Sequence, residues 1–466
     1  MAFNEDTRVK IPTILHLVRL GYQYLSLKKQ HSDIKTNIFP ELFLQAIAKI
    51  NPYLGQDDVR RLLEEVKLTL DNEDLGKAFY EKLIASSGPK LIDFECFNNN
   101  SFHVVTELTY KNGNEEFRPD ITLLINGMPL VFIEVKKPNN PEGILAERDR
   151  INKRFQNKKF KRFINITQFM IFSNNMEYED GAIQPLQGAF YASASYGEPI
   201  FNYFREEQTL ILSEFSKPLD EQKELEILKD NNKETLRSSN EYQLNKNEFR
   251  PTNRICTSLL NKDRLAFILR YALTYVEETQ GLEKHIMRYP QIFATKAIEH
   301  KLNKGIKKGI IWHTQGSGKT ALAYYNVRFL TDYFQQKQII PKFYFIVDRI
   351  DLLTQAQREF TCRGLTVYII DSREAFSQDI KATKAIHNNT GKPEVTVVNI
   401  QKFKDDPDVV SMNDYDVTIQ RVYFLDEVHR SYNPEGSFLA NLEQSGMSTL
   451  FSTKKIRSSI SFVFNR

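Results

Sequence analysis

The chain has 466 residues, and this length predicts two to four domains. Hydrophobic residues make up 41% and charged residues 26%, which excludes a largely disordered chain, and a net charge of +4 neither requires nor excludes a nucleic-acid partner. No apolar run reaches the roughly 18 residues of a membrane span, and the three cysteines are too widely spaced for a zinc or disulfide pattern. Since we also find no signal peptide, we expect a cytoplasmic protein with no membrane contact.

Up to about residue 90, apolar residues recur at helical spacing, for example in 42–50 and 59–70. Short β-rich runs follow at 103–109, 121–125, 130–135 and 169–172. A basic stretch separates the last two runs. The segment 217–247 is rich in Glu, Lys, Asp and Asn, which predicts a solvated helix or a linker between domains.

After this segment, five apolar runs alternate with helical stretches, at 309–312, 343–347, 366–370, 395–398 and 422–425. Strands that are buried on both faces and separated by helices predict a doubly wound parallel sheet, and the fold class is therefore α/β. We expect no regular element in the Ser- and Lys-rich C-terminal stretch. The predicted division is a first domain at 1–215, a linker or solvated helix at 216–250, a second domain at 251–447 and an irregular tail at 448–466.

The first candidate site lies in the β-rich part and combines two carboxylates with a lysine. Pro119-Asp120 is followed, after two apolar runs, by Glu134-x-Lys136. Carboxylate oxygens in such a set hold Mg²⁺, which polarises a scissile phosphate, and the lysine orients the attacking water. An ordinary surface strand would explain Glu-x-Lys alone, but the Pro-Asp pair favours a metal-dependent nuclease. We predict that Asp120, Glu134 and Lys136 are catalytic and that the two carboxylates are metal ligands.

The connection between the two runs decides whether these carboxylates meet. Asn126-Gly127 is a signal for a tight hairpin. A plain two-residue loop would pair Asp120 with Ile133 and turn it away from Glu134. A longer connection, or a β-bulge, would pair Asp120 with Glu134 and place both on one face. We predict the longer connection or the bulge.

The second candidate site is a glycine-containing loop after the strand at 309–312. The sequence from Gly309 to Thr320, with Gly-Ser-Gly-Lys-Thr at its end, is typical of a strand, a phosphate-binding loop and the start of a helix, although His313 stands where glycine is usual. Backbone N–H groups would cradle the phosphates of ATP, Lys319 would reach the β- and γ-phosphates, and the Thr320 hydroxyl would bind Mg²⁺. The residues predicted to bind this cofactor are Gln315, Gly316, Ser317, Gly318, Lys319 and Thr320.

The strand at 422–425 ends in a pair of carboxylates. In a parallel sheet that also carries a phosphate-binding loop, one such carboxylate holds Mg²⁺ through water and the other activates the attacking water. We therefore predict Asp426 as a cofactor-binding metal ligand and Glu427 as a catalytic residue. A chance helix cap is the alternative.

These motifs resemble two known families. The segment with Asp120, Glu134 and Lys136 resembles the PD-(D/E)xK nuclease domain of type I restriction subunits, a mixed sheet flanked by helices. The later motifs are similar to superfamily 2 helicases, whose first motor lobe is a RecA-like doubly wound parallel sheet. Arg288-Tyr-Pro-Gln291 looks like the adenine-reading motif of that family, which implies that Gln291 contacts ATP.

The resemblance also implies contacts with DNA. By similarity with the helicase motifs, Arg349, Gln401 and Lys402 would lie near the DNA backbone. Many of the nucleases carry a Gln-x-x-x-Tyr helix after the lysine, which is missing here. Three arginines occupy that stretch, and both a phosphate contact and a solvated helix face remain open for them. They are Arg148, Arg150 and Arg154.

The resemblance covers about residues 10 to 445 and implies the endonuclease subunit of a type I restriction-modification system. Such a subunit cleaves double-stranded DNA with Mg²⁺, translocates it with ATP, and docks on methyltransferase and specificity subunits. Because no second RecA-like lobe follows, we expect a truncated or frameshifted subunit that binds ATP without a complete motor. The alternatives are a standalone nuclease-helicase in repair or phage defence, and a catalytically silent fragment that docks on the methyltransferase complex.

Overall fold

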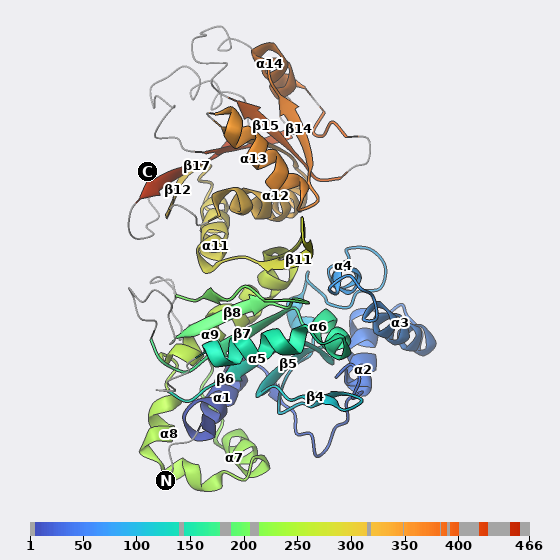
Figure 1. Ribbon diagram of the computed structural model, residues 1–466, viewed down its shortest axis with the longest axis vertical. Helices are drawn as coiled ribbons and strands as arrows, with labels where there is room; N and C mark the ends of the chain where they lie inside the picture. Colours follow the sequence, from blue (N-terminus) through green and yellow to red (C-terminus); the bar gives the residue numbers. More distant parts are fainter. Residues whose placement is uncertain are drawn as a thin grey trace. The chain divides into compact units, whose positions relative to one another are not determined.

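The computed structural model describes residues 5–138, 144–177, 188–205, 214–314, 318–347, 349–382, 384–388, 392–399, 419–426 and 448–456. The chain forms two compact units (Figure 1). The first comprises Met1–Tyr275 with Leu282–Ile286, and the second comprises Val276–Gly281 with Met287–Arg466. No helix among the described residues is long and apolar enough to cross a membrane.

In the first unit, most helices lie before residue 100 or after residue 220, and the others connect two strands. They are η1 (Asp6–Lys10), α1 (Ile11–Arg19), α2 (Pro40–Ile50), α3 (Gln56–Thr69), α4 (Lys77–Leu83), η2 (Phe97–Asn99), α5 (Leu145–Phe155), η3 (Lys158–Phe160), α6 (Lys161–Ile166), α7 (Glu221–Asp230), η5 (Glu234–Ser238), α8 (Asn240–Asn245), α9 (Pro251–Leu260), α10 (Lys262–Phe267) and η6 (Ile268–Ala272). The first 90 residues are thus largely helical, as predicted. In α3 the buried residues recur at helical spacing, from Val59 to Val66, and the Asp58 carboxylate accepts from the backbone N–H of Gly55 at the start of the helix.

The core of the first unit is a mixed sheet of seven strands in the order β1-β2-β5-β6-β7-β8-β9. Their bounds are β1 (Gln23–Tyr24), β2 (Phe102–Thr106), β5 (Ile121–Ile125), β6 (Met128–Val135), β7 (Phe169–Ser173), β8 (Ala189–Ser193) and β9 (Asn202–Tyr203). The pairs β1/β2 and β6/β7 are parallel and the others antiparallel. Two-stranded ribbons are formed by β3 (Tyr110–Asn112) with β4 (Glu115–Phe117), and by β10 (Leu273–Glu278) with β11 (Gly281–Ile286). Figure 1 shows α5 and α6 crossing one face of the sheet.

The hairpin between β5 and β6 contains the predicted bulge. Its loop has only two residues, Asn126 and Gly127, but Leu130 on β6 has no partner on β5. The paired residues are Ile121 with Ile133, Thr122 with Phe132, Leu123 with Val131, Leu124 with Pro129, and Ile125 with Met128. Continuing this register by one residue brings Asp120 opposite Glu134. The bulge, and not a longer loop, therefore places Asp120 and Glu134 on the same face of the sheet.

The turn of this hairpin is held by its neighbours. Gly127 has a φ of 77°, and a Cβ atom there would lie 2.7 Å from the backbone nitrogen of Phe43. The Asn126 amide nitrogen donates to the Leu91 carbonyl, and its oxygen accepts from the backbone N–H of Ser101. The turn is thus both left-handed and closely packed, which leaves room only for glycine at position 127.

The second unit is built on a sheet of six parallel strands in the order β12-β17-β16-β13-β15-β14. Its elements are α11 (Tyr289–Asn303), β12 (Lys308–Thr314), α12 (Lys319–Gln335), β13 (Ile340–Val347), α13 (Ile350–Thr361), β14 (Thr366–Ile370), α14 (Arg373–Lys381), β15 (Glu394–Asn399), β16 (Ile419–Leu425) and β17 (Ser448–Ile456). The five predicted strands are confirmed, and so is the parallel α/β class. The described residues of β13, β15 and β16 are almost wholly buried, as strands with both faces covered must be.

The described part of the C-terminal stretch was predicted wrongly, and residues 457–466 lie outside the described residues. We expected an irregular tail from residue 448, whereas Ser448–Ile456 forms strand β17. This strand lies between β12 and β16 and pairs with both in parallel. Its Ser- and Lys-rich sequence carries little strand signal, so the hydrogen bonds offered on both sides by its neighbours decide its conformation.

Of the two alternatives for residues 216–250, the structure agrees with a solvated helix and not with a linker between domains. Residues 216–250 hold α7 and α8 and belong to the first compact unit, which continues to Tyr275. Glu224 of α7 is only 3% exposed, and it accepts hydrogen bonds from Tyr242 and Lys246. Charged residues that are satisfied by one another in this way give a polar sequence without an exposed linker.

Candidate functional site

The structure brings the three residues of the predicted nuclease site together. Asp120 directly precedes β5, Glu134 lies in β6, and Lys136 directly follows β6. The Asp120 carboxylate accepts a hydrogen bond of 2.9 Å from the backbone N–H of Val135, which ties the start of β5 to the end of β6. The Lys136 ammonium lies 3.6 Å from the Glu134 carboxylate and 3.9 Å from that of Asp120.

Glu134 is an unusually buried carboxylate. It is 5% exposed, and its Oε1 atom finds no hydrogen-bond donor among the described residues. Burial, and then the negative charges of Asp120 and Glu147, raise the pKa of Glu134 well above its ordinary value, against the opposing charge of Lys136. An anionic oxygen in this setting is stabilised by a bound cation.

Two further carboxylates surround Lys136 and were not predicted. Glu147 on α5 is 4% exposed, and its carboxylate lies 3.4 Å from the Lys136 ammonium. Glu5, just before η1, contributes to the electrostatic environment of Lys136 and has its own pKa raised, chiefly by burial. The only sequence signal for Glu147 is an acid within a basic helix, and Glu5 carries none.

Lys136 is the cationic centre of this group. Burial by itself lowers the pKa of Lys136, but the charges of Glu147, Glu134 and Asp120 outweigh it, and the pKa lies above its ordinary value. Its ammonium also donates to the Val135 carbonyl at 3.0 Å. Lys136 is therefore held as a charged ammonium close to the carboxylates of Asp120 and Glu134.

The residues present fit Mg²⁺. Among the residues that the structure describes, no three His, Cys, Asp or Glu side chains converge as a complete ligand set. Mg²⁺ does not need such a set, because it is commonly bound through one or two carboxylates and keeps several waters. Asp120 and Glu134 on one face, with the unpartnered Oε1 of Glu134, provide the two carboxylates.

The three arginines of α5 take different positions. Arg148 is partly exposed and pairs with its neighbour Asp149, while Arg150 is 62% exposed and pairs with Glu147 at 3.3 Å. The Arg154 guanidinium lies 3.8 Å above the Phe117 ring. The two alternatives for these arginines, a phosphate contact and a solvated helix face, both stay open.

In the second unit, the end of the phosphate-binding loop and the end of β16 lie close together. Gly318 has a φ of 79° and precedes α12, which begins with Lys319 and Thr320. The Lys319 ammonium lies 3.9 Å from the Asp426 carboxylate. Two residues that are more than a hundred positions apart are thus neighbours at the carboxyl ends of parallel strands, where ligands bind in such sheets.

Gln291 contacts the loop directly. Its side-chain oxygen accepts from the backbone N–H of Arg288, and its nitrogen donates to the carbonyl of Gly318, both at 2.9 Å. A Cβ at position 318 would lie 2.7 Å from that nitrogen. The side chain is therefore engaged with the loop itself, and its contact with adenine stays a prediction.

Several predicted residues lie outside the described part of the chain. They are Gln315, Gly316, Ser317, Gln401, Lys402 and Glu427. Of the residues predicted near DNA, Arg349 is described, and it forms an ion pair with Asp351 on the surface of α13.

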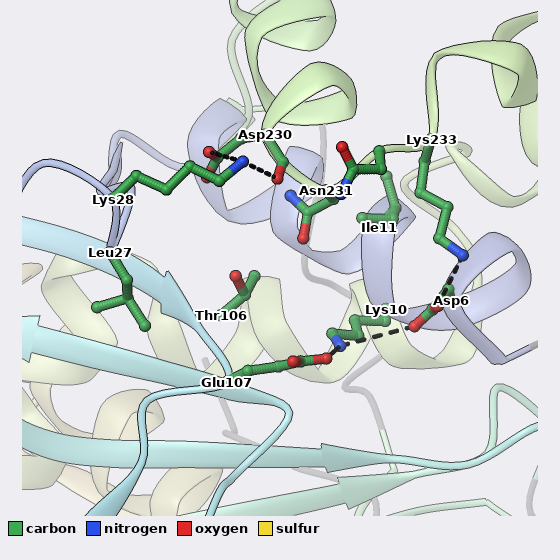
Figure 2. Close-up of a pocket in the computed structure, with 11 residues that line it drawn as sticks. Asp6, Lys10, Ile11, Leu27, Lys28, Thr106, Glu107, Asp230, Asn231 and Lys233 are labelled. Carbon is green, nitrogen blue, oxygen red and sulfur yellow. Dashed lines mark hydrogen bonds and ion pairs between the residues drawn. The ribbon is translucent and has the colours of Figure 1, made fainter.

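A pocket of about 310 Å³ in the first unit is lined by none of the predicted site residues (Figure 2). It borders the nuclease strands, because the backbone N–H of its residue Glu107 donates to the Asp120 carbonyl. Its three lysines each face carboxylates of the same pocket, so its charges balance. The ion pairs are Lys10 with Asp6 and Glu107, Lys28 with Asp230, and Lys233 with Asp6.

Comparison with known families agrees with both units. Residues 2–181 match the family described as type I restriction enzyme R protein N terminus, and residues 284–457 match the family described as type III restriction enzyme, res subunit. By these matches both units are similar to restriction-enzyme subunits. More particularly, the chain is similar to the endonuclease subunits of type I restriction enzymes.

Curated relatives support this over most of the chain. A putative type I restriction enzyme endonuclease subunit of Methanocaldococcus jannaschii is 25% identical over 95% of this chain and 41% of its own length. A type I restriction enzyme endonuclease subunit of Staphylococcus aureus strain COL is 23% identical over 92% of this chain and 40% of its own. The chain thus spans about 40% of the length of these two relatives. A solved Sulfolobus solfataricus SWI2/SNF2 ATPase core in complex with dsDNA overlaps 39% of this chain and 32% of its own, at 11% identity and a TM-score of 0.26, which is too low to support an argument.

Proposed function

We propose that this chain cleaves DNA with Mg²⁺ through its first unit and binds ATP through its second, as part of a type I restriction endonuclease subunit. The observation that carries the proposal is the meeting of Asp120, Glu134 and Lys136 at the bulged hairpin, with a buried carboxylate oxygen that lacks a donor. The family matches supply the substrate class, because both families are named for restriction enzymes.

The chemistry follows from what these side chains can hold. Asp120 and Glu134 would bind the ion through their oxygens. Mg²⁺, when bound, supplies polarisation of the scissile phosphate and charge neutralisation. The Lys136 ammonium, close to both carboxylates, orients the attacking water and stabilises the charge that develops on the phosphate oxygens.

The second unit carries the ATP part of the proposal. Lys319 would pair with the β- and γ-phosphates, and the Thr320 hydroxyl and the Asp426 carboxylate would hold the accompanying Mg²⁺. Their placement at the start of α12 and the end of β16, with Lys319 and Asp426 3.9 Å apart, supports these roles. Catalysis by Glu427, translocation along double-stranded DNA, and docking on methyltransferase and specificity subunits complete the proposal, and we expect such a complex in the cytoplasm.

Nicking of supercoiled plasmid DNA tests the nuclease part. We expect Mg²⁺-dependent nicking that falls by at least about a hundredfold in Lys136→Ala, since a charge-stabilising donor contributes on this order. Lys137→Ala is the matched control, because Lys137 is the exposed neighbouring lysine. Equal nicking by wild-type protein and Lys136→Ala would show that the cleavage comes from elsewhere.

Binding of ATP tests the second part separately. Titration calorimetry with Mg²⁺ and ATP should show binding by the wild-type chain and its loss in Lys319→Ala. Lys337→Ala, at the surface beyond the far end of α12, is the control. Retained affinity in Lys319→Ala would rule out the predicted phosphate site.

A further inference from the structure

The nuclease proposal gives no role to Glu147. It projects from α5, an element separate from the two strands that carry the predicted metal ligands. Of the three carboxylates that form ion pairs with Lys136, that of Glu147 lies nearest, at 3.4 Å, compared with 3.6 Å for Glu134 and 3.9 Å for Asp120. A glutamate side chain that is only 4% exposed needs polar or cationic partners to offset its loss of hydration.

The two cations around Glu147 share one oxygen. Its Oε2 atom lies 3.4 Å from the Lys136 ammonium and 3.3 Å from the Arg150 guanidinium. Arg150 sits one helical turn further along α5, which is the spacing at which side chains of a helix meet. Arg150 is 62% exposed, so the buried side of the Glu147 carboxylate is left to Lys136.

The metal site creates a need for such a partner. A divalent ion held by Asp120 and Glu134 would compete with the Lys136 ammonium for these two carboxylates, and would repel that ammonium as well. Lys136 acts on the phosphate only if an anion that the ion does not use holds it in place. Glu147 does not converge with Asp120 and Glu134 as a ligand set among the described residues, so its carboxylate stays available.

We propose that Glu147 is a positioning residue that holds the Lys136 ammonium beside the scissile phosphate while Asp120 and Glu134 hold Mg²⁺. The inference rests on the proposed nuclease function and adds to it a residue outside the two-carboxylate and lysine motif. Glu147 neither gives nor takes a proton in this role, because it acts only through the attraction of its charge for the Lys136 ammonium. A residue that replaces Glu147 would need to place one buried negative charge at the same distance from the Lys136 ammonium.

The test separates positioning from metal binding. In Glu147→Gln we expect the rate of plasmid nicking at saturating Mg²⁺ to fall by about 10- to 100-fold, with the dissociation constant of Mg²⁺ from calorimetry changed by less than about threefold. Glu134→Gln is the reference for a ligand, and it should lose Mg²⁺ binding itself. Asp149→Asn is the matched control, because Asp149 is an exposed acid on the same helix.

Two results would overturn the proposal: nicking by Glu147→Gln at the wild-type rate, or a loss of Mg²⁺ affinity comparable to that in Glu134→Gln. A wild-type chain that neither binds Mg²⁺ nor nicks DNA would instead remove the nuclease function on which it rests. Glu147→Asp, which keeps the charge, should recover part of the lost rate and provides the comparison if the glutamine variant does not fold.

A crystal structure of Glu147→Gln with Mg²⁺ gives a readout independent of activity. We expect the Lys136 ammonium to leave its wild-type position once the third carboxylate is gone. An unchanged position would show that Asp120 and Glu134 hold it unaided, and would contradict the positioning role.

Discussion

Lys284 on β11 makes the stability of the first unit depend on pH. Its ammonium is fully buried and donates to the Thr167 carbonyl and to the side-chain oxygen of Gln168, at 3.2 and 2.8 Å. Both acceptors are neutral oxygens, and burial lowers the pKa of Lys284 from 10.5 to about 7. Replacing it with methionine removes the titrating group and keeps a side chain of similar length.

The size of the effect follows from this pKa. Between pH 7 and 10.5 the unfolded chain binds one more proton at Lys284 than the folded chain does, so the contribution of this lysine to stability rises with pH. Below pH 7 the cost of the buried charge is fully present. Since one pKa unit corresponds to about 1.4 kcal/mol, that cost reaches about 5 kcal/mol at most. The hydrogen bonds lost in Lys284→Met add an offset that does not change with pH in this range.

Urea unfolding of both proteins, monitored on the transition of the first unit, measures this dependence. From about pH 6.5 to about pH 9.5, we expect the wild-type free energy of unfolding to gain about 3 kcal/mol relative to Lys284→Met. Taking the difference cancels the other titrating groups, which both proteins share. If the two free energies change in parallel over this range, Lys284 is not held in the neutral form and the reasoning from its burial is wrong.

Two further changes test the second unit. Asp379→Ala leaves the ammonium of Lys342, which is 1% exposed, without its carboxylate partner at 2.9 Å. Breaking such a buried pair should lower the free energy of unfolding by about 3–5 kcal/mol in a urea titration. Gly318→Ala places a Cβ 2.7 Å from the Gln291 nitrogen at a left-handed φ, and we expect its affinity for ATP, measured by calorimetry, to fall at least about tenfold. An unchanged free energy of unfolding in Asp379→Ala would show that Lys342 finds another partner. An unchanged ATP affinity in Gly318→Ala would show that the loop accommodates the Cβ.

Patterns within short windows predicted much of the fold. The apolar runs that became β13, β15 and β16 are buried on both faces, so each is continuous in hydrophobicity and recognisable without its neighbours. The same holds for β5 and β6. Requiring Asp120 and Glu134 on one face left a longer loop or a bulge, and the structure has the bulge. For the nuclease site, the residues joined by this hairpin were predictable because they are close in sequence.

Contacts between distant segments were not predictable. Glu147 reaches Lys136 only because α5 packs back on the sheet, and Glu5 only because the N-terminal segment ends nearby. In the segment expected to be a linker, the polar residue Glu224 is buried because Tyr242 and Lys246 satisfy its carboxylate. The composition of such a segment gives the number of its charged residues, but it does not show which of them contact one another.

The sequence by itself determined the helical N-terminal part, five strands of the second unit and the two motifs, because these depend on periodicity and on neighbours within a few residues. Tertiary structure alone decided that Ser448–Ile456 becomes a strand between β12 and β16, that Lys284 is buried beside Thr167 and Gln168, and that the Glu147 carboxylate lies next to Lys136. Each of these outcomes depends on hydrogen bonds, burial or charge supplied by residues far away in the chain. The free energy that selects them exists only once those residues are packed together.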